Sequence, residues 1–237
     1  MVRPLREKDA FLALLKQSGA AVTYTPIMRI EPISQTESIK PLIVKFDQFD
    51  QAIFISANAA EIGLQWLGEY RPKLPIETQI FAVGQQTAET LTRSGLEVTC
   101  PQSQQNTEGL LELEQLQRLE GKSTIIFRGG EGRQSLGDTL QQRGAKVTYC
   151  ELYHRVIEPL NLALALRQAQ DTDCLITHSG EILRAMAESA ALAVPVVVPS
   201  ERVANMAQEL GYQTVVVAEN ALPESMYKAV QAVFKIA

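Results

Sequence analysis

Five stretches of small, hydrogen-bonding residues each follow a short apolar run and precede a helical pattern. They are Ser56-Ala57-Asn58, Gly84-Gln85-Gln86-Thr87, Arg128-Gly129-Gly130-Glu131-Gly132-Arg133, Thr177-His178-Ser179-Gly180 and Ser200-Glu201-Arg202. In a parallel α/β sheet such junctions lie at the carboxyl ends of the strands, where ligands bind. The helix starts there offer unpaired N–H groups and the positive end of the helix dipole. The pattern therefore predicts a binding site for a ligand with several carboxylates.

Each junction taken alone also fits ordinary helix capping, because Ser, Thr and Asn are common N-cap residues. Arg128 and Arg133 bracket a glycine-rich turn, from which they either reach an anion or extend into solvent. The number of junctions in both halves of the chain is what favours the binding interpretation.

Two phosphate-binding signatures are incomplete. Gly121-Lys122-Ser123 ends like a P-loop, but Leu116 stands where the first glycine is required. Gly130-Glu131-Gly132 lacks the third glycine of a dinucleotide motif, because Ser135 occupies that position. We expect no nucleotide cofactor. A nucleotide-dependent transferase is an alternative function, and it would require nucleotide binding.

Metal sites and disulfides are also not expected. The chain has three cysteines, Cys100, Cys150 and Cys174, without a C-x-x-C pair, and two histidines, His154 and His178. Each cysteine lies within or at the end of a strand-like run, so buried thiols are predicted.

Composition limits the classes of partner. The 237 residues are 46% hydrophobic, which suits two small domains with real cores. A net charge of −5 gives no long-range attraction for nucleic acid or an anionic membrane. No apolar run approaches the ~18 residues of a membrane span, so we expect a soluble, cytoplasmic protein. A monomer is expected because no extra apolar face is evident.

A helix, a glycine and a short strand recur four times, in residues 14–24, 91–100, 140–149 and 207–217. Gly19, Gly95, Gly144 and Gly211 fall where a helix ends in a left-handed residue. Further strands are expected at 51–56, 78–83, 123–128, 173–178 and 195–200. Helices are expected at about 5–18, 59–69, 85–94, 107–118, 133–143, 160–169, 180–190, 201–210 and 222–235. This alternation predicts an α/β fold with doubly wound parallel sheets.

Two segments, 26–46 and 150–159, are less regular. Each follows a unit of helix, glycine and strand, and these units end in the similar stretches VTYTPIMRIEP and VTYCELYHRVIEP. Each is expected to carry the chain out of one sheet in an extended, proline-limited conformation, as a crossing between domains does. We therefore expect one domain inserted into another. Residues 1–30 with 158–237 would form the first and 36–150 the second, joined by a two-stranded linker of about 26–36 and 150–159. The opening MVRP leaves room only for a very short or truncated first strand.

The order of these motifs resembles the uroporphyrinogen-III synthase family. The matching pieces are VRP, IFISANA, AVGQQTAETLTRSG, FRGGEGRQSLGDTLQQRGAKVTYCELYHR, LITHSGEIL and VVPSERVANMAQELGY. They span nearly the whole chain and include both linkers. The resemblance implies two flavodoxin-like domains. It also implies an enzyme of haem biosynthesis that closes hydroxymethylbilane into uroporphyrinogen III, inverting the last pyrrole ring and losing water without a cofactor or metal. The substrate carries eight carboxylates. A transient contact with the preceding pathway enzyme is left open.

The resemblance also implies roles for individual residues. Tyr153 matches the tyrosine proposed in the family as the acid, and a tyrosine hydroxyl is protonated at neutral pH. The substrate-binding positions are Ser56, Asn58, Thr87, Arg128, Gly129, Gly130, Arg133, Thr177, Ser179 and Ser200. Ser200 stands where some relatives have adjacent threonines. Tyr153 is alternatively a linker side chain packed at a hinge, and His154 and Arg155 are interpreted as linker residues.

A second hypothesis for the whole chain is an inactive family member or a two-domain sensor of small anions. The short N-terminus and the altered last motif are the features that support it.

Overall fold

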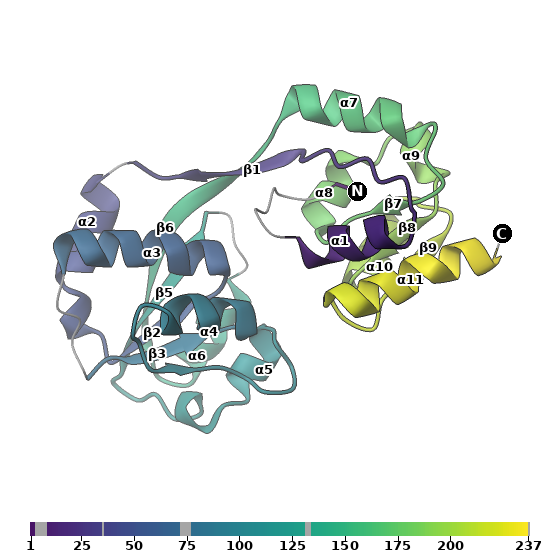
Figure 1. Ribbon diagram of the computed structural model, residues 1–237. Coiled ribbons are helices and arrows are strands. Elements are labelled where there is room, and N and C mark those ends of the chain that lie inside the picture. Colours follow the sequence, from purple (N-terminus) through teal and green to yellow (C-terminus); the bar gives the residue numbers. More distant parts are fainter. Residues whose placement is uncertain (3–8, 35, 72–76, 131–133, 237) are drawn as a thin grey trace. The chain divides into compact units, whose positions relative to one another are not determined.

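A computed structural model describes residues 1–2, 9–34, 36–71, 77–130 and 134–236, and Figure 1 shows its helices and strands. The chain divides into two compact units. The split unit comprises Met1–Arg29 and Val156–Ala237, and the inserted unit comprises Ile30–Arg155.

The inserted unit is built on a six-stranded sheet. Its strands are β1 (Met28–Pro32), β2 (Gln51–Phe54), β3 (Gln79–Ala82), β4 (Val98–Thr99), β5 (Ser123–Gly129) and β6 (Lys146–Ile157). The spatial order is β1-β6-β5-β2-β3-β4, and β2 to β6 run parallel to one another. The Ile33 N–H donates to the Leu152 carbonyl and the Glu158 N–H to the Ile27 carbonyl, so β1 runs antiparallel to β6.

This strand order corrects one prediction. After β2 the chain adds β3 and β4 on one side, then returns to add β5 and β6 on the other. When the five parallel strands β2 to β6 are numbered 1 to 5 along the chain, their order across the sheet is 3-2-1-4-5. This is a doubly wound order, but it is not the flavodoxin order 2-1-3-4-5. For this unit, doubly wound is right and flavodoxin-like is wrong. Helix and strand periodicity alone does not specify on which side of the first strand each later strand is added.

Helices cover both faces of this sheet. One core contains residues of α2 (Thr36–Val44), α3 (Ala57–Tyr70) and α4 (Gln85–Thr92), where Phe54 and Phe127 stack with ring centroids 4.4 Å apart. The opposite core contains residues of α5 (Thr107–Leu111), the 3-10 turn η2 (Glu114–Leu116) and α6 (Ser135–Gln142). A further 3-10 turn, η1 (Phe46–Gln48), precedes β2.

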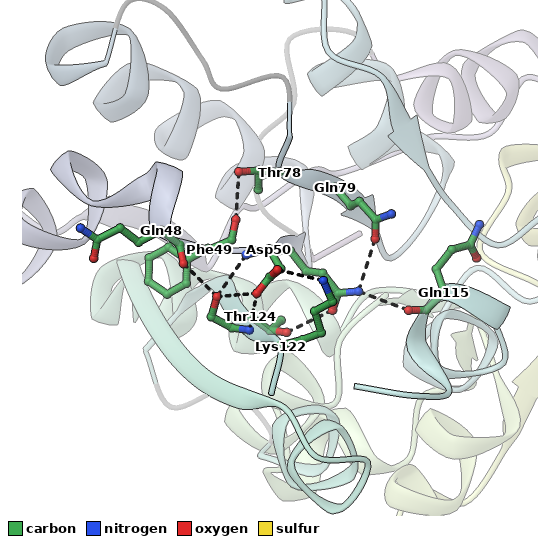
Figure 2. A network of polar contacts seen from close by, with 10 residues as sticks. Gln48, Phe49, Asp50, Thr78, Gln79, Gln115, Lys122 and Thr124 are labelled. Atoms are coloured by element: carbon green, nitrogen blue, oxygen red, sulfur yellow. Dashed lines mark hydrogen bonds and ion pairs between the residues drawn. The ribbon is translucent and has the colours of Figure 1, made fainter. Parts of the chain in front are cut away.

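A polar network joins the amino ends of β2 and β5 (Figure 2). The Asp50 carboxylate accepts hydrogen bonds from the Ser123 N–H at 2.8 Å and from Lys122 Nζ at 3.0 Å. Buried Gln51 accepts from the Thr124 hydroxyl at 3.1 Å and donates to the Gln115 carbonyl at 3.2 Å. These contacts satisfy buried polar groups at the amino ends of the strands, whereas the predicted ligand site lies at their carboxyl ends.

The split unit has a three-stranded parallel sheet. Its strands are β7 (Leu175–Ile176), β8 (Val196–Val198) and β9 (Val215–Val217), in that order. One core contains residues of α7 (Pro159–Ala169), α8 (Gly180–Ala185), α9 (Ser189–Leu192) and α10 (Glu201–Glu209). The other contains residues of α1 (Ala10–Gln17) and α11 (Pro223–Ile236). The first strand, expected to be very short, is a single bridge between Val2 and Thr177.

Helix α2 was not predicted, because residues 26–46 were interpreted as an irregular crossing. Pro41 lies inside α2 and removes one backbone donor, which argues against a helix. Ile39 and Ile43 are 1% and 0% exposed in the core, so burial outweighs that cost.

Other boundaries differ from the predicted ones. Residues 20–24, where a strand was expected, form none. The Met1 amino group donates to the Thr23 carbonyl and the Thr25 N–H donates to the Met1 carbonyl, so the backbone here pairs with one residue and not with a strand. The helices expected at 107–118 and 180–190 are each interrupted, after Leu111 and Ala185. The left-handed glycines are confirmed, with φ between 81° and 95° at Gly19, Gly95, Gly144 and Gly211.

Candidate active site

The strand order of the inserted unit reverses between β2 and β5. At such a switch point the chain leaves neighbouring strands on opposite faces, which opens a crevice at their carboxyl ends. Ser56 follows β2 at this edge, and Arg128 and Gly129 end β5. The switch point thus brings together two of the five predicted junctions.

A β-bulge sets the direction of Tyr153. Arg128 of β5 pairs with Glu151 of β6, but the next residue, Gly129, pairs with Tyr153. Leu152 is therefore the additional residue of the bulge and has no partner in the register with β5. Without the bulge Tyr153 would follow Glu151 on the same face. Instead Tyr153 belongs to the core beneath α3, together with Leu152.

Gly129 makes room for the Tyr153 ring. A Cβ atom added to Gly129 would lie 2.5 Å from Cε2 of Tyr153, which is closer than the Cβ atoms of real proteins approach other heavy atoms. The next residue, Gly130, donates its N–H to the Tyr153 carbonyl oxygen at 2.8 Å. Consecutive glycines therefore fix both the ring and the backbone of Tyr153.

The hydroxyl of Tyr153 lies 2.9 Å from Oγ of Ser56. The same Ser56 Oγ accepts a hydrogen bond from the Ala59 N–H at 3.1 Å and so caps α3. Tyr153 is fully buried, with 0% exposure, whereas Ser56 is half-buried. Arg155 is exposed, and its Cζ lies 5.8 Å from the Tyr153 ring centroid.

Arg128 is engaged inside the inserted unit. Its Nη2 lies 2.7 Å from Oε1 of Glu151, and its Cζ lies 4.1 Å from the ring centroid of Tyr149. Its side chain is 7% exposed. Burial raises the pKa of the Tyr149 hydroxyl, against the opposing effect of the Arg128 charge. Arg128 is thus a packed, paired residue.

A cavity of about 500 Å³ lies beside this pair. Its lining includes Glu31, Ser34, Ser38, Tyr149, Glu151 and His154. The lining holds two carboxylates, Glu31 and Glu151, of which Glu151 is paired with Arg128.

Helix α4 starts beside β3 without a side-chain cap. Gly84 is its N-cap residue, and the Gln85 N–H donates to the Gln105 side chain at 3.2 Å. Thr87 in the first turn is 4% exposed, and its hydroxyl has no hydrogen-bond partner among the described residues. Asn58, in the first turn of α3, is half-buried.

The split unit carries the remaining predicted residues at the carboxyl ends of β7 and β8. Ser179 caps α8 by accepting from the Glu181 N–H at 3.2 Å, and buried Thr177 accepts from the Ser179 N–H at 3.3 Å. Ser200 is the N-cap residue of α10 but makes no side-chain cap bond.

The comparison with known proteins identifies the family. The family model of uroporphyrinogen-III synthase HemD matches residues 9–228. The chain is 32% identical to the uroporphyrinogen-III synthase of Escherichia coli (strain K12), and the match covers 98% of both chains. The enzyme of the same name from Salmonella typhimurium is 30% identical with the same coverage. The chain belongs to the uroporphyrinogen-III synthase family.

Solved structures that carry the family name share the fold. A mutant uroporphyrinogen III synthase from the extremely thermophilic bacterium Thermus thermophilus has a TM-score of 0.69 at 18% identity, over 100% of this chain and 98% of that chain. The Helicobacter pylori uroporphyrinogen-III synthetase has a TM-score of 0.62 at 16% identity, over 98% of both. The α/β fold of the family is therefore also the fold of this chain.

The residues that resemble uroporphyrinogen-III synthases fall into separate groups. Tyr153, Ser56, Gly129 and Gly130 lie together at the switch point. Thr87 lies at the start of another helix of the same unit, and Thr177, Ser179 and Ser200 lie in the split unit. Arg133 lies outside the described residues.

Sequence reasoning missed the hydrogen bond between Ser56 and Tyr153 and the group of Arg128, Tyr149 and Glu151. The glycine pair Gly129-Gly130 was a usable signal for the first, since it marks a close approach to the end of β5. No signal in the sequence predicted the second.

Among the described residues, the cysteine thiols and the possible metal ligands form no further candidate site. Burial raises the pKa of the Cys150 and Cys174 thiols to about 12. In the described part of the chain, no three His, Cys, Asp or Glu side chains group in a way that could hold a metal ion. No helix in that part is long and apolar enough to cross a membrane.

Proposed function

We propose that this chain closes hydroxymethylbilane into uroporphyrinogen III, with inversion of the last pyrrole ring and loss of water. The observation that carries the proposal is the match, over 98% of both chains, to a relative named uroporphyrinogen-III synthase. The position of Tyr153 and Ser56 at the switch point of the inserted unit supports it.

The reaction begins with the loss of the hydroxyl from the first ring. The pyrrole nitrogen stabilises the resulting electrophile, an azafulvene. The last ring attacks through its substituted carbon and gives a spiro intermediate, which fragments and recloses with that ring turned over. The protein must assist the departure of the hydroxyl and hold the chain folded so that the substituted carbon meets the electrophile.

Tyr153 is the proposed source of the proton for the departing hydroxyl. Its ring is fixed by Gly129 and its hydroxyl is bonded to Ser56, so the donor occupies one position. Such orientation, rather than a large driving force for proton transfer, is the effect expected of a tyrosine. The competing role is that Tyr153 only packs at the end of β6.

The carboxylates of the substrate are proposed to bind at the starts of helices. In an acidic protein with few basic residues at these junctions, backbone N–H groups and helix dipoles must supply most of the attraction. The N-cap residues of α4 and α10, Gly84 and Ser200, make no side-chain cap bond, and this supports carboxylate binding at these two helix starts. Thr87, Asn58 and Ser179 are the proposed hydroxyl and amide contacts, and buried Thr177 is proposed to hold the Ser179 backbone beside them.

The two units are proposed to be domains that fold around their own cores, with boundaries near those expected from the sequence, 1–30 with 158–237 and 36–150. Each unit has two hydrophobic cores of its own, one on each face of its sheet. The protein is proposed to act in the cytoplasm as a monomer on a small-molecule substrate, without nucleic acid or membrane.

The test is the conversion of freshly made hydroxymethylbilane, followed by chromatographic separation of the two uroporphyrinogen isomers. Consumption faster than the spontaneous rate, with isomer III as the product, supports the proposal. Consumption at the spontaneous rate, with isomer I alone, contradicts it.

A further inference from the structure

We infer that Ser56, and not Tyr153, presents the proton to the substrate, and that Tyr153 acts through Ser56 as the residue that supplies it. The inference rests on the proposed function and specifies the donor of the same site. It follows from the hydrogen bonds of two hydroxyl groups and from their exposure.

The first step concerns the group that accepts the hydrogen of the Tyr153 hydroxyl. The hydroxyl of Tyr153 is fully buried, and a buried O–H group needs an acceptor. Ser56 Oγ, at 2.9 Å, is the one hydrogen-bond partner that the Tyr153 hydroxyl has among the described residues. The Tyr153 O–H therefore donates to Ser56.

The second step concerns the two lone pairs of Ser56. A serine hydroxyl has one donor hydrogen and two acceptor sites. The Ala59 N–H at 3.1 Å occupies one acceptor site and the Tyr153 O–H occupies the other. Within the described chain no acceptor takes up the remaining hydrogen of Ser56, so this O–H is available to a ligand.

The third step concerns access. A group that protonates a substrate oxygen must come within about 2.6–3.2 Å of it. Tyr153 has 0% exposure and lies in the core beneath α3, whereas Ser56 is half-buried at the carboxyl end of β2. Of the two hydroxyls, Ser56 is the one that a substrate reaches without displacement of the core.

The proton transfers balance. The Ser56 hydrogen passes to the oxygen of the hydroxymethyl group as the C–O bond breaks, and water leaves. The Tyr153 hydrogen passes to Ser56 in the same step. The products are a phenolate and an azafulvenium ion, whose positive charge resides largely on the pyrrole nitrogen. When the last ring recloses, its unsubstituted carbon loses a proton, which returns through Ser56 to the phenolate. The net change is loss of one water.

Variants at Ser56 test this inference. Ser56→Gly removes the hydroxyl but keeps a residue that serves well as an N-cap, and Ser56→Thr keeps a hydroxyl on the same carbon. We expect Ser56→Gly to lower kcat by ~10-fold or more, at the low end of general-acid effects, and Ser56→Thr to stay within about 3-fold of the parent. Asn106→Gly is the matched control, because Asn106 caps α5 through the Gly109 N–H at 2.8 Å. Its kcat should not change.

The double variant separates a relay from two independent groups. If Tyr153 acts through Ser56, then Ser56→Gly with Tyr153→Phe is no slower than the slower single variant. Multiplied effects, about 100-fold from two 10-fold losses, would mean two independent hydroxyls and would overturn the inference.

The single variants distinguish the other failures. A Ser56→Gly protein with the parental kcat, beside a slow Tyr153→Phe protein, would overturn the relay and leave Tyr153 as the acid. Parental rates in both single variants would overturn the acid assignment itself, while isomer III as the product would still support the synthase function. Melting temperatures of all variants identify any loss that comes from unfolding.

Discussion

The hydroxyl oxygen of Tyr153 on β6 lies 2.9 Å from Oγ of Ser56, the residue that caps α3 after β2. A bulge opposite Gly129 directs Tyr153 into this position, and the strand order places β2 beside β5. The contact therefore depends on three separate segments of the chain.

Tyr153→Phe should lower the rate of isomer III formation by ~10-fold or more, because the substitution removes the hydroxyl and keeps the ring packed on Gly129. Single-turnover kinetics with purified protein measures this. Tyr212→Phe is the matched control, since its buried hydroxyl donates to the Leu183 carbonyl at 3.1 Å in the split unit. That variant should lose about 1 kcal/mol of stability and no activity. Equal rates in the parent and Tyr153→Phe would reduce Tyr153 to a packing residue.

Gly129→Ala should lower both activity and stability, because the new methyl group overlaps the Tyr153 ring. Overpacking of this kind costs about 1–3 kcal/mol, and chemical denaturation measures it. Gly68→Ala, at an exposed position of α3 with open space around it, should instead stabilise the protein by about 0.5–1 kcal/mol. An active, fully stable Gly129→Ala protein would show that the ring does not need its observed position.

Thr87→Val should weaken substrate binding without destabilising the protein, because the Thr87 hydroxyl bonds to no described residue. Loss of one hydrogen bond to a carboxylate corresponds to about 1.5–3 kcal/mol, or at least a 10-fold rise in KM with little change in kcat. Thr90→Val on the same helix is the control, since the Thr90 hydroxyl already donates to the Gln86 carbonyl at 3.0 Å. An unchanged KM in Thr87→Val would exclude Thr87 from the binding site.

Asp50→Asn should destabilise the inserted unit and leave activity unchanged. Hydrogen bonds from the Ser123 backbone and from Lys122 lower the pKa of Asp50 from 3.8 to about 2. The folded-state pKa is depressed, so the stabilisation is fully present above about pH 4 and is lost as the pH falls towards 2. Asp50 is 38% exposed, so we discount for solvent screening and expect about 1 kcal/mol at neutral pH.

Denaturation of the parent and Asp50→Asn between pH 7 and pH 2 checks this. The difference between the two proteins should shrink as the pH falls from 4 to 2. Asp47→Asn, which removes an exposed pairing with Arg71 at 3.0 Å, should have a smaller effect. A difference that does not depend on pH would mean that Asp50 contributes through packing and not through its charge.

Local sequence patterns predicted most of the elements, because glycines such as Gly95 and Gly144 end helices in a conformation that other residues avoid. They did not predict α2, because its burial through Ile39 and Ile43 is a tertiary effect that opposes the local preference of Pro41. The strand order was likewise not encoded in any single segment.

The candidate site was predicted as a set of junctions, but the contacts within it were not. Tyr153 and Ser56 are 97 residues apart, and their meeting depends on the strand order and on a one-residue bulge. Arg128 illustrates the opposite case. A basic residue beside glycines suggested an anion site, yet pairing with Glu151 and stacking on Tyr149 engage its guanidinium.

The isomer composition of the product tests the central claim most directly. Fresh hydroxymethylbilane is divided between rising amounts of this protein and equal amounts of heat-denatured protein, and the two uroporphyrinogen isomers are quantified by chromatography. The account predicts that isomer III becomes the dominant product as active protein increases, while the denatured samples yield isomer I. Isomer I as the main product at every protein concentration would contradict it.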